Sequence, residues 1–395
     1  MNNELKYKLM YMFTYAPVGI ISPLIGQYMS QIGFSGTQIG TVTAISTAVA
    51  VFASTFWGKK YSNCKDGRKV ILFLCLAASI AALISSYITS FILFTIMYGI
   101  MYFFQGPIMG LSDAMVLEDK QNFSSIRLWG AIGYAAAVFI AGRIGQSIGL
   151  DKIFIMYLAT YLVGGGFAMS IKHLNKNDTI SEQDPKIDRI GFKHLLKEKK
   201  TLQLILCGIF IFGTNVANNT YYGFLFRDGG GTVAGIGLVF LLMVGSEAPF
   251  MGLAPKLALK FTQEKLIAIA ILISALRFGW YATGPSYQWL IATFFLQGAV
   301  NGIILVEYMK YISSVVNPRL IGIAVSAFYA ISSNGGTILC NFFGGMIMDK
   351  MGSTGVYGFF SILNVIGLIL YLGFKLDKPK REKNVEKGID KSKKR

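Results

Sequence analysis

Long apolar segments follow one another along the whole chain, separated by short polar loops. We place them at residues 9–30, 39–57, 70–89, 91–115, 128–148, 152–171, 202–225, 233–254, 265–284, 287–309, 320–346 and 355–374. A helix of about 20 apolar residues crosses the hydrocarbon core of a bilayer, and each segment has about that length. Because backbone polar groups in lipid must be satisfied within the segment, the pattern predicts an all-α membrane protein with twelve transmembrane helices.

A polar stretch at residues 172–200 divides the segments six and six. Its mixed charges and Pro185 are typical of a linker, and a short amphipathic helix is predicted near residues 190–199. We therefore expect an N-terminal six-helix half at 1–171, a cytoplasmic linker at 172–200, a C-terminal six-helix half at 201–374 and a basic tail at 375–395.

The composition supports a membrane protein. Hydrophobic residues make up 53% of the chain and charged residues only 14%, whereas a soluble domain averages about 25% charged residues. The four cysteines follow no disulfide or metal-ligand spacing, and no Walker A, H-E-x-x-H or G-x-S-x-G motif occurs. We therefore expect neither an enzyme nor an ATP-driven pump, and no cofactor or metal.

Basic residues give the chain a net charge of +17, and they gather in alternate loops. They follow the second and eighth apolar segments, recur in the linker and fill the tail, while the opposite loops contain few of them. This positive-inside pattern predicts that both termini lie in the cytoplasm. The tail is interpreted as a topology determinant that contacts anionic lipid, and no nucleic-acid partner is expected.

The two halves share a charged motif. Asp113 ends the fourth segment and Arg127 opens the fifth, while Glu307 ends the tenth and Arg319 opens the eleventh. The offsets between the halves are 194 residues for the carboxylates and 192 for the arginines. A same-direction repeat of six spans is typical of transporters that bind their solute between the halves, near the middle of the membrane.

Charges inside apolar segments are costly, by roughly 2.5–3.5 kcal/mol at the centre of a helix on insertion scales, so they normally face a bundle interior or a watery cavity. Glu247 and Arg277 lie deepest, at depths that differ by about 6 Å at 1.5 Å per residue. They form either a neutralised structural pair or a site for solute or proton, and we favour the second interpretation. The duplicated Asp113 and Arg127 either contact solute or latch a gate. Glu307, with Arg319, is assigned to a gate.

Uncharged polar residues form a second set within the spans. Asn215, Asn218 and Asn219 share one helix face, and Gln297 shares a face with Asn301 on the tenth segment. Amides in lipid are unfavourable unless they are hydrogen-bonded, so we expect both faces to point inward. They either line a cavity or bond across helices.

With these features in place, the chain resembles the major facilitator superfamily over essentially its whole length. The loop from Gly58 to Gly67-Arg68-Lys69 is similar to the superfamily motif G-x-x-x-D-R-x-G-R-R, although Ser62 stands at the position of the aspartate and the spacing is two residues longer. The resemblance implies two six-helix halves that move around a central solute site.

Within the superfamily the chain resembles the lactose permease, phenylpropionate permease and nucleoside–proton symporter branch. The resemblance implies that Asp113 binds solute with Arg127 as its partner, and that Tyr134 stands where a tryptophan stacks on the solute ring. It implies a role for Glu247 in affinity and coupling, and places Arg277 near the proton site. Packing inside the bundle is the alternative role for Tyr134.

Two departures from that branch limit what carries over. The histidine and glutamate that serve proton coupling on the tenth span are Gln297 and Val300 here, and acidic positions on the seventh span are Asn215 and Asn218. Lactose is therefore not the expected solute, and the proton route of lactose permease is not transferred.

Together these features predict a monomeric secondary transporter of the bacterial cytoplasmic membrane. We expect proton symport of a small polar or aromatic solute of the sugar, nucleoside or aromatic-acid class, with Glu247 and Arg277 in coupling. The residues expected to bind solute are Asp113, Arg127, Tyr134, Asn215, Asn218, Asn219 and Gln297. The alternatives are a proton-antiport exporter of amphipathic compounds and, more remotely, a membrane sensor that does not transport.

Overall fold

The computed structural model describes residues 2–172, 195, 198–317 and 320–377. Within these ranges the chain is helical and contains no strand, as predicted. Most of the predicted linker, the basic tail from residue 378 onward and Arg319 lie outside the described residues.

The N-terminal half consists of six crossings, one of which is divided at a proline. Pro107 has no backbone N–H to continue a helix, so the fourth crossing breaks there. The helices are α1 (Asn3–Gln31), α2 (Gly36–Ser62), α3 (Gly67–Ser85), α4 (Phe91–Gln105), α5 (Ile108–Glu118), α6 (Phe123–Ile148) and α7 (Lys152–Ser170).

The C-terminal half also makes six crossings. Its helices are α9 (Lys199–Asp228), α10 (Val233–Phe261), α11 (Gln263–Tyr281), α12 (Tyr287–Ala292), α13 (Phe294–Val315), α14 (Ile321–Ala327), the π-helix η4 (Phe328–Gly335) and α15 (Gly336–Gly373). The helical run Ile321–Gly373 contains 53 residues, about 80 Å at 1.5 Å per residue, which is more than twice the thickness of a hydrocarbon core. Gly352 interrupts it with a φ of 69°, so the run makes two crossings.

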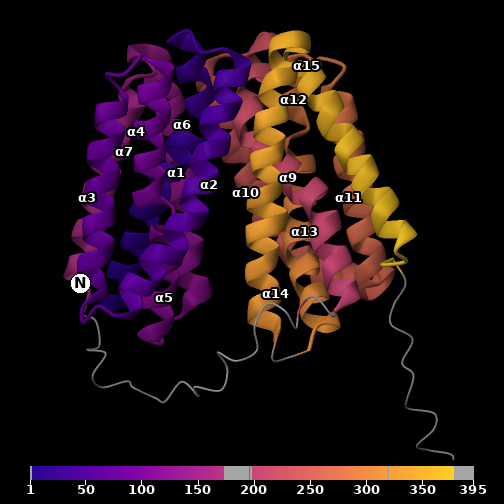
Figure 1. Cartoon of the computed structure of the whole chain (residues 1–395), viewed down its shortest axis with the longest axis horizontal. Helices are drawn as coiled ribbons and strands as arrows, with labels where there is room; N and C mark the ends of the chain where they lie inside the picture. The colour runs from indigo at the N-terminus through magenta and orange to yellow at the C-terminus, as the bar shows by residue number, and fades with distance from the viewer. Residues whose placement is uncertain (1, 173–194, 196–197, 318–319, 378–395) are drawn as a thin grey trace, which may run out of the picture.

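The two halves stand side by side (Figure 1). The start of α1 and the end of α15 lie at the same end of the bundle, which we call the terminal face; the other end is the opposite face. Large apolar side chains cover much of the outside, and Leu259 is 90% exposed. Exposed apolar surface of this extent is unusual in a soluble monomer and suits contact with lipid.

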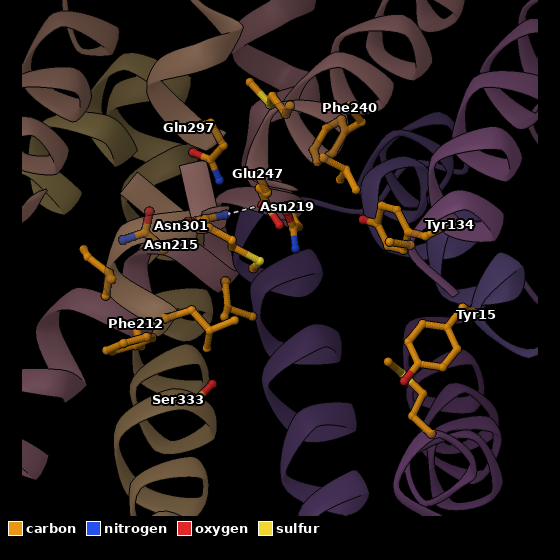
Figure 2. A pocket seen from close by; sticks show the side chains of 18 of the residues that line it. Tyr15, Tyr134, Phe212, Asn215, Asn219, Phe240, Glu247, Gln297, Asn301 and Ser333 are labelled. Carbon is orange, nitrogen blue, oxygen red and sulfur yellow. Dashed lines mark hydrogen bonds between the residues drawn. The ribbon is translucent and has the colours of Figure 1, made fainter. Parts of the chain in front are cut away.

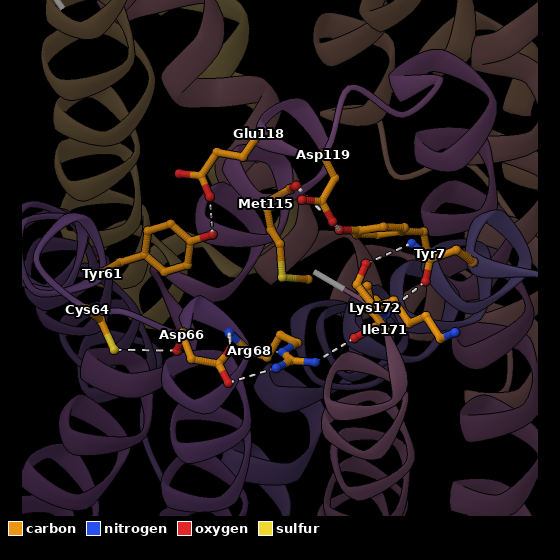
Figure 3. Close-up of polar contacts among 11 residues, drawn as sticks. Tyr7, Tyr61, Cys64, Asp66, Arg68, Met115, Glu118, Asp119, Ile171 and Lys172 are labelled. Atoms are coloured by element: carbon orange, nitrogen blue, oxygen red, sulfur yellow. Dashed lines mark hydrogen bonds and ion pairs between the residues drawn. The ribbon is translucent and has the colours of Figure 1, made fainter. Parts of the chain in front are cut away.

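Two tyrosine–carboxylate contacts join helix ends at the terminal face of the N-terminal half (Figure 3). The Tyr7 hydroxyl donates to Asp119, just after α5, and the Tyr61 hydroxyl of α2 donates to Glu118 of α5 at 3.0 Å. The end of α5 is therefore held against α1 and α2.

The loop between α2 and α3 is held by a carboxylate that the motif comparison did not identify. Asp66 caps α3 by accepting the backbone N–H of Arg68, and the Arg68 side chain donates to both Asp66 oxygens at 2.9 and 3.0 Å. Arg68 also donates to the Ile171 carbonyl at 2.7 Å, which ties α3 to the end of α7. The hydrogen bond from the Arg68 guanidinium lowers the pKa of Asp66 below its ordinary value.

Candidate functional site

A cavity of about 440 Å³ lies between the halves (Figure 2). Its volume falls in the range of roughly 300–1,000 Å³ that is usual for small-molecule sites. The N-terminal half contributes the rings of Tyr15 and Tyr134, whereas the C-terminal half contributes the amides together with further aromatic and aliphatic side chains. The polar side consists chiefly of Asn215, Asn219, Glu247, Gln297, Asn301 and Ser333.

Glu247 is the carboxylate among the residues that line this cavity. It lies on α10 and accepts a hydrogen bond of 2.8 Å from the Asn301 amide on α13. The two helices can approach closely because α13 has glycines at the contact: a Cβ on Gly298 would lie 1.9 Å from the Ser246 hydroxyl, and one on Gly302 would lie 2.9 Å from the Glu247 carbonyl.

Arg277 lies behind the cavity wall, on α11, and is only 2% exposed. It donates from Nη2 to the Asn215 amide oxygen at 2.8 Å, and its guanidinium lies 4.4 Å from the ring centre of Phe278 and 5.7 Å from that of Tyr281. No ion pair joins it to Glu247 in the described part of the chain. The difference of about 6 Å in depth left that contact within reach of two long side chains, but Glu247 bonds to Asn301 on α13 and Arg277 bonds to Asn215 on α9.

The predicted pairing of Asp113 with Arg127 is formed. Their ion pair measures 2.5 Å, and the hydroxyls of Tyr11 and Tyr15 also donate to Asp113, at 2.7 and 3.5 Å. Arg127 lines the cavity and exposes 46% of its side chain, whereas Asp113 stands behind it. The carboxylate therefore orients the arginine, and the arginine is the member of the pair that faces the cavity.

Glu307 is 1% exposed, and its carboxylate pairs with Lys310 one turn away at 2.8 Å. This local compensation was expected from the sequence. The predicted partner, Arg319, lies outside the described residues, so the second copy of the charged motif stays a prediction.

The remaining predicted residues divide into two groups. Tyr134, Asn215, Asn219 and Gln297 line the cavity. Asn218 does not: it is fully buried, and its amide oxygen accepts from the Tyr357 hydroxyl at 2.8 Å. Asn215, Asn218 and Asn219 share one helix face because of their i, i+3 and i+4 spacing. Asn218 lies at the edge of that face and points into the core of the C-terminal half instead of the cavity.

Several lining residues were not among the predicted binding residues. Tyr15, Phe212, Phe240, Tyr329 and Ser333 belong to this group, and Asn301 was noted only as a polar partner of Gln297. Aromatic and serine residues occur throughout the spans, so no sequence signal separated these from packing residues. Tyr329 and Ser333 are placed by η4, whose wider turn changes the helix face presented to the cavity.

At the opposite face the halves are joined by a helix cap that crosses between them. Asp349 of α15 accepts the backbone N–H groups of Gly36 and Thr37, the first residues of α2, at 2.5 and 2.8 Å, and the Thr37 hydroxyl at 2.5 Å. The helices can meet here because Gly345 has no side chain: a Cβ at this position would lie only 2.3 Å from the Gly36 carbonyl oxygen. Gly345 also packs directly against Gly40.

The same device occurs in the pseudo-symmetric position. Gln146, at the end of α6, accepts the backbone N–H of Val233, the first residue of α10, at 3.0 Å. Four residues earlier, Gly142 packs against Gly237, just as Gly345 precedes Asp349 by four residues. Each half thus caps the first turn of a helix in the other half.

These contacts close the cavity toward the opposite face. A bond of 3.2 Å from Arg227 to Gln27 also joins the two halves at that face. Arg127, near the start of α6, lines the cavity and exposes 46% of its side chain.

Two six-helix halves around a central cavity, joined to each other at one end, are the architecture of a secondary transporter. The chain belongs to the MFS_1 like family, a group of major facilitator proteins, whose family model matches residues 4–359. The predicted superfamily and fold, and the expectation of a transporter rather than an enzyme, are confirmed.

Its relatives and structural neighbours are transporters of similar length. The chain is 28% identical to the maltose permease of Geobacillus stearothermophilus, over 93% of each chain. It is 31% identical to the uncharacterized transporter YwbF of Bacillus subtilis (strain 168), over 92% of this chain and 91% of the other. The crystal structure of the nucleoside transporter NupG superposes with a TM-score of 0.82 at 18% identity, covering 96% of this chain and all of NupG.

Proposed function

We propose that this protein imports a small, neutral, hydroxyl-rich solute of the sugar or nucleoside class by proton symport, as a monomer in a bacterial cytoplasmic membrane. The terminal face would be cytoplasmic, in keeping with the basic loops. The observation that carries the proposal is a cavity in which two tyrosine rings of the N-terminal half lie across from amides of the C-terminal half, with one carboxylate among the lining residues.

The two sides suit the two faces of a sugar. The rings of Tyr15 and Tyr134 offer flat apolar surface on the N-terminal half, while Asn219 and Gln297 offer donors and acceptors on the other side (Figure 2). The Gln297 side-chain oxygen is buried and has no partner among the described residues, so it is available to accept from a hydroxyl. A polar site of this kind discriminates strongly against analogues that lack the hydroxyl.

The similar proteins support the same solute class. A maltose permease and a nucleoside transporter are named for solutes that carry several hydroxyl groups on sugar rings. The cavity wall is largely apolar, but it includes the amides of Asn215, Asn219, Gln297 and Asn301, and these amides are why we place import before export.

Coupling is assigned to Glu247. In this conformation its carboxylate accepts from Asn301 and faces the cavity, so solute and proton can influence each other directly. Arg277 would act on the same site through Asn215, whose amide oxygen it holds. Arg127, oriented by Asp113, would contact the solute at the cytoplasmic end of the cavity, and Glu307 with Arg319 would serve the gate.

Purified protein in liposomes tests this proposal. We expect counterflow with one or more sugars or nucleosides, and accumulation of that solute when a proton gradient is applied. Glu247→Gln should keep counterflow and lose proton-driven accumulation, because exchange needs no net proton movement. Glu264→Gln, a carboxylate at the start of α11 away from the cavity, is the matched control and should keep both activities.

Two results would contradict the proposal. Full proton-driven accumulation by Glu247→Gln would remove Glu247 from coupling. Proton-driven extrusion of amphipathic compounds, without counterflow of any sugar, nucleoside or aromatic acid, would identify an exporter instead.

A further inference from the structure

The guanidinium of Arg277 is buried with most of its hydrogen-bonding capacity unused. An arginine carries five N–H donors. The Nη2 atom donates to Asn215, but Nε and Nη1 have no acceptor among the described residues. A buried charge of this kind normally requires both a counter-charge and hydrogen-bond partners.

The groups around it are also donors. The side-chain nitrogen of Asn218 and the hydroxyls of Tyr222 and Tyr281 are fully buried and have no partner in the described part of the chain. The Tyr281 ring centre lies 5.7 Å from the Arg277 guanidinium and 5.9 Å from the Tyr222 ring centre. The acceptor of Asn218 is already occupied by the Tyr357 hydroxyl.

No carboxylate among the described residues balances the charge. The ionisable groups that interact electrostatically with Arg277 are Tyr222, Tyr281 and Tyr357, from α9, α11 and α15. Glu247, the carboxylate of the adjacent cavity, bonds to Asn301 on α13 and is not among these groups. The enclosed cluster therefore combines one positive charge with an excess of unpaired donors.

We propose that Arg277, Asn218, Tyr222 and Tyr281 bind a small monovalent inorganic anion of the size of chloride. Such an ion accepts several hydrogen bonds at once, donates none and supplies the missing negative charge. Asn215 separates the cluster from the cavity, since it lines the cavity and bonds to Arg277. The anion would thus be a structural partner of the C-terminal half, distinct from the transported solute.

Thermal unfolding of the purified protein in sodium chloride and in sodium gluconate, at equal ionic strength, tests this site. A ligand of the native state raises the melting temperature in a saturable way. We expect chloride, and bromide in its place, to raise the melting temperature with saturation, and gluconate to have no such effect. Bromide should also give an anomalous diffraction peak beside Arg277.

Variants separate an anion site from a general salt effect. Arg277→Gln should abolish the saturable chloride effect, and Tyr281→Phe, which removes one hydroxyl, should weaken apparent affinity by about tenfold, equivalent to roughly 1.4 kcal/mol. Asn215→Asp places a carboxylate oxygen where Arg277 already donates at 2.8 Å, so it should make stability independent of chloride. Arg143→Gln, an exposed arginine of the other half, should respond like the wild type.

Equal melting temperatures of the wild type in chloride and gluconate would overturn the proposal. So would a chloride response that survives in folded Arg277→Gln or in Asn215→Asp. If chloride has no effect but a carboxylate solute stabilises the wild type and not Arg277→Gln, the cluster recognises the solute and the inorganic anion site is refuted.

Discussion

The cap that Asp349 places on α2 should set the balance between the two conformations of the transporter. Its carboxylate accepts from Gly36, Thr37 and the Thr37 hydroxyl across the interface. Within its own half, α2 has a separate cap, because Ser35 accepts from Gln38 and the Gln38 side chain accepts from Ser35 in return. Asp349→Ala therefore removes the contact between halves and leaves α2 able to fold.

The size of the effect follows from the contacts that are lost. Replacing a capping side chain by alanine costs about 0.5–2 kcal/mol, and a negative charge near a helix N-terminus adds about 0.3–1 kcal/mol. When the opposite face opens, the N–H groups of Gly36 and Thr37 face water in the wild type and in Asp349→Ala alike. The lost stabilisation therefore applies mainly to the state in which the opposite face is closed. A coupling of about 1–3 kcal/mol shifts a two-state equilibrium by roughly 5- to 150-fold.

Distances between spin labels measure this shift. Ser90 and Gln288 are exposed positions at the opposite face, one in each half, and suit labelled cysteines in a background where Cys64 is serine. We expect a single short distance in the wild type and an added longer distance in Asp349→Ala. Asp349→Asn, which keeps an acceptor but loses the charge, should give an intermediate population.

Lys350→Ala is the matched control, because Lys350 is the exposed neighbour of Asp349. It should reproduce the wild-type distance. If Asp349→Ala also reproduces it, the cross-half cap does not hold the opposite face closed and the reasoning is refuted.

Three further predictions concern packing, solute and pH. Gly298→Val should lower the melting temperature in detergent, because its Cβ would lie 1.9 Å from the Ser246 hydroxyl and overpacking costs about 1–3 kcal/mol; an unchanged melting temperature would contradict the α10–α13 contact. Tyr134→Ala should weaken solute binding, measured by ligand-induced stabilisation, by up to about tenfold for a lost ring contact of about 0.5–1.5 kcal/mol, and Tyr134→Phe should not. Because Arg68 lowers the pKa of Asp66, their contact stabilises the fold above the ordinary carboxyl pKa of about 4 and is lost as pH falls through the lowered value. Asp66→Asn should therefore lose less stability than the wild type between about pH 5 and pH 3, and identical acid profiles would count against the pairing.

Much of the site was accessible from the sequence because one physical rule governs it. Charges and amides avoid lipid, so their presence in apolar segments indicated the interior of the bundle, and Tyr134, Asn219 and Gln297 do line the cavity. The spacing of Asp113 and Arg127 at adjacent helix ends likewise predicted a contact that the structure forms.

The sequence by itself determined the class of protein, the number of crossings and the depth of each charge, because hydropathy reports position along the membrane normal. Only the tertiary structure decided which neighbour each charge meets. Glu247 and Arg277 are predicted to lie within reach of each other, yet one bonds to Asn301 and the other to Asn215. The physical reason is that a partner depends on the rotation of each helix about its axis, and that rotation is set by interhelical packing at glycines such as Gly298.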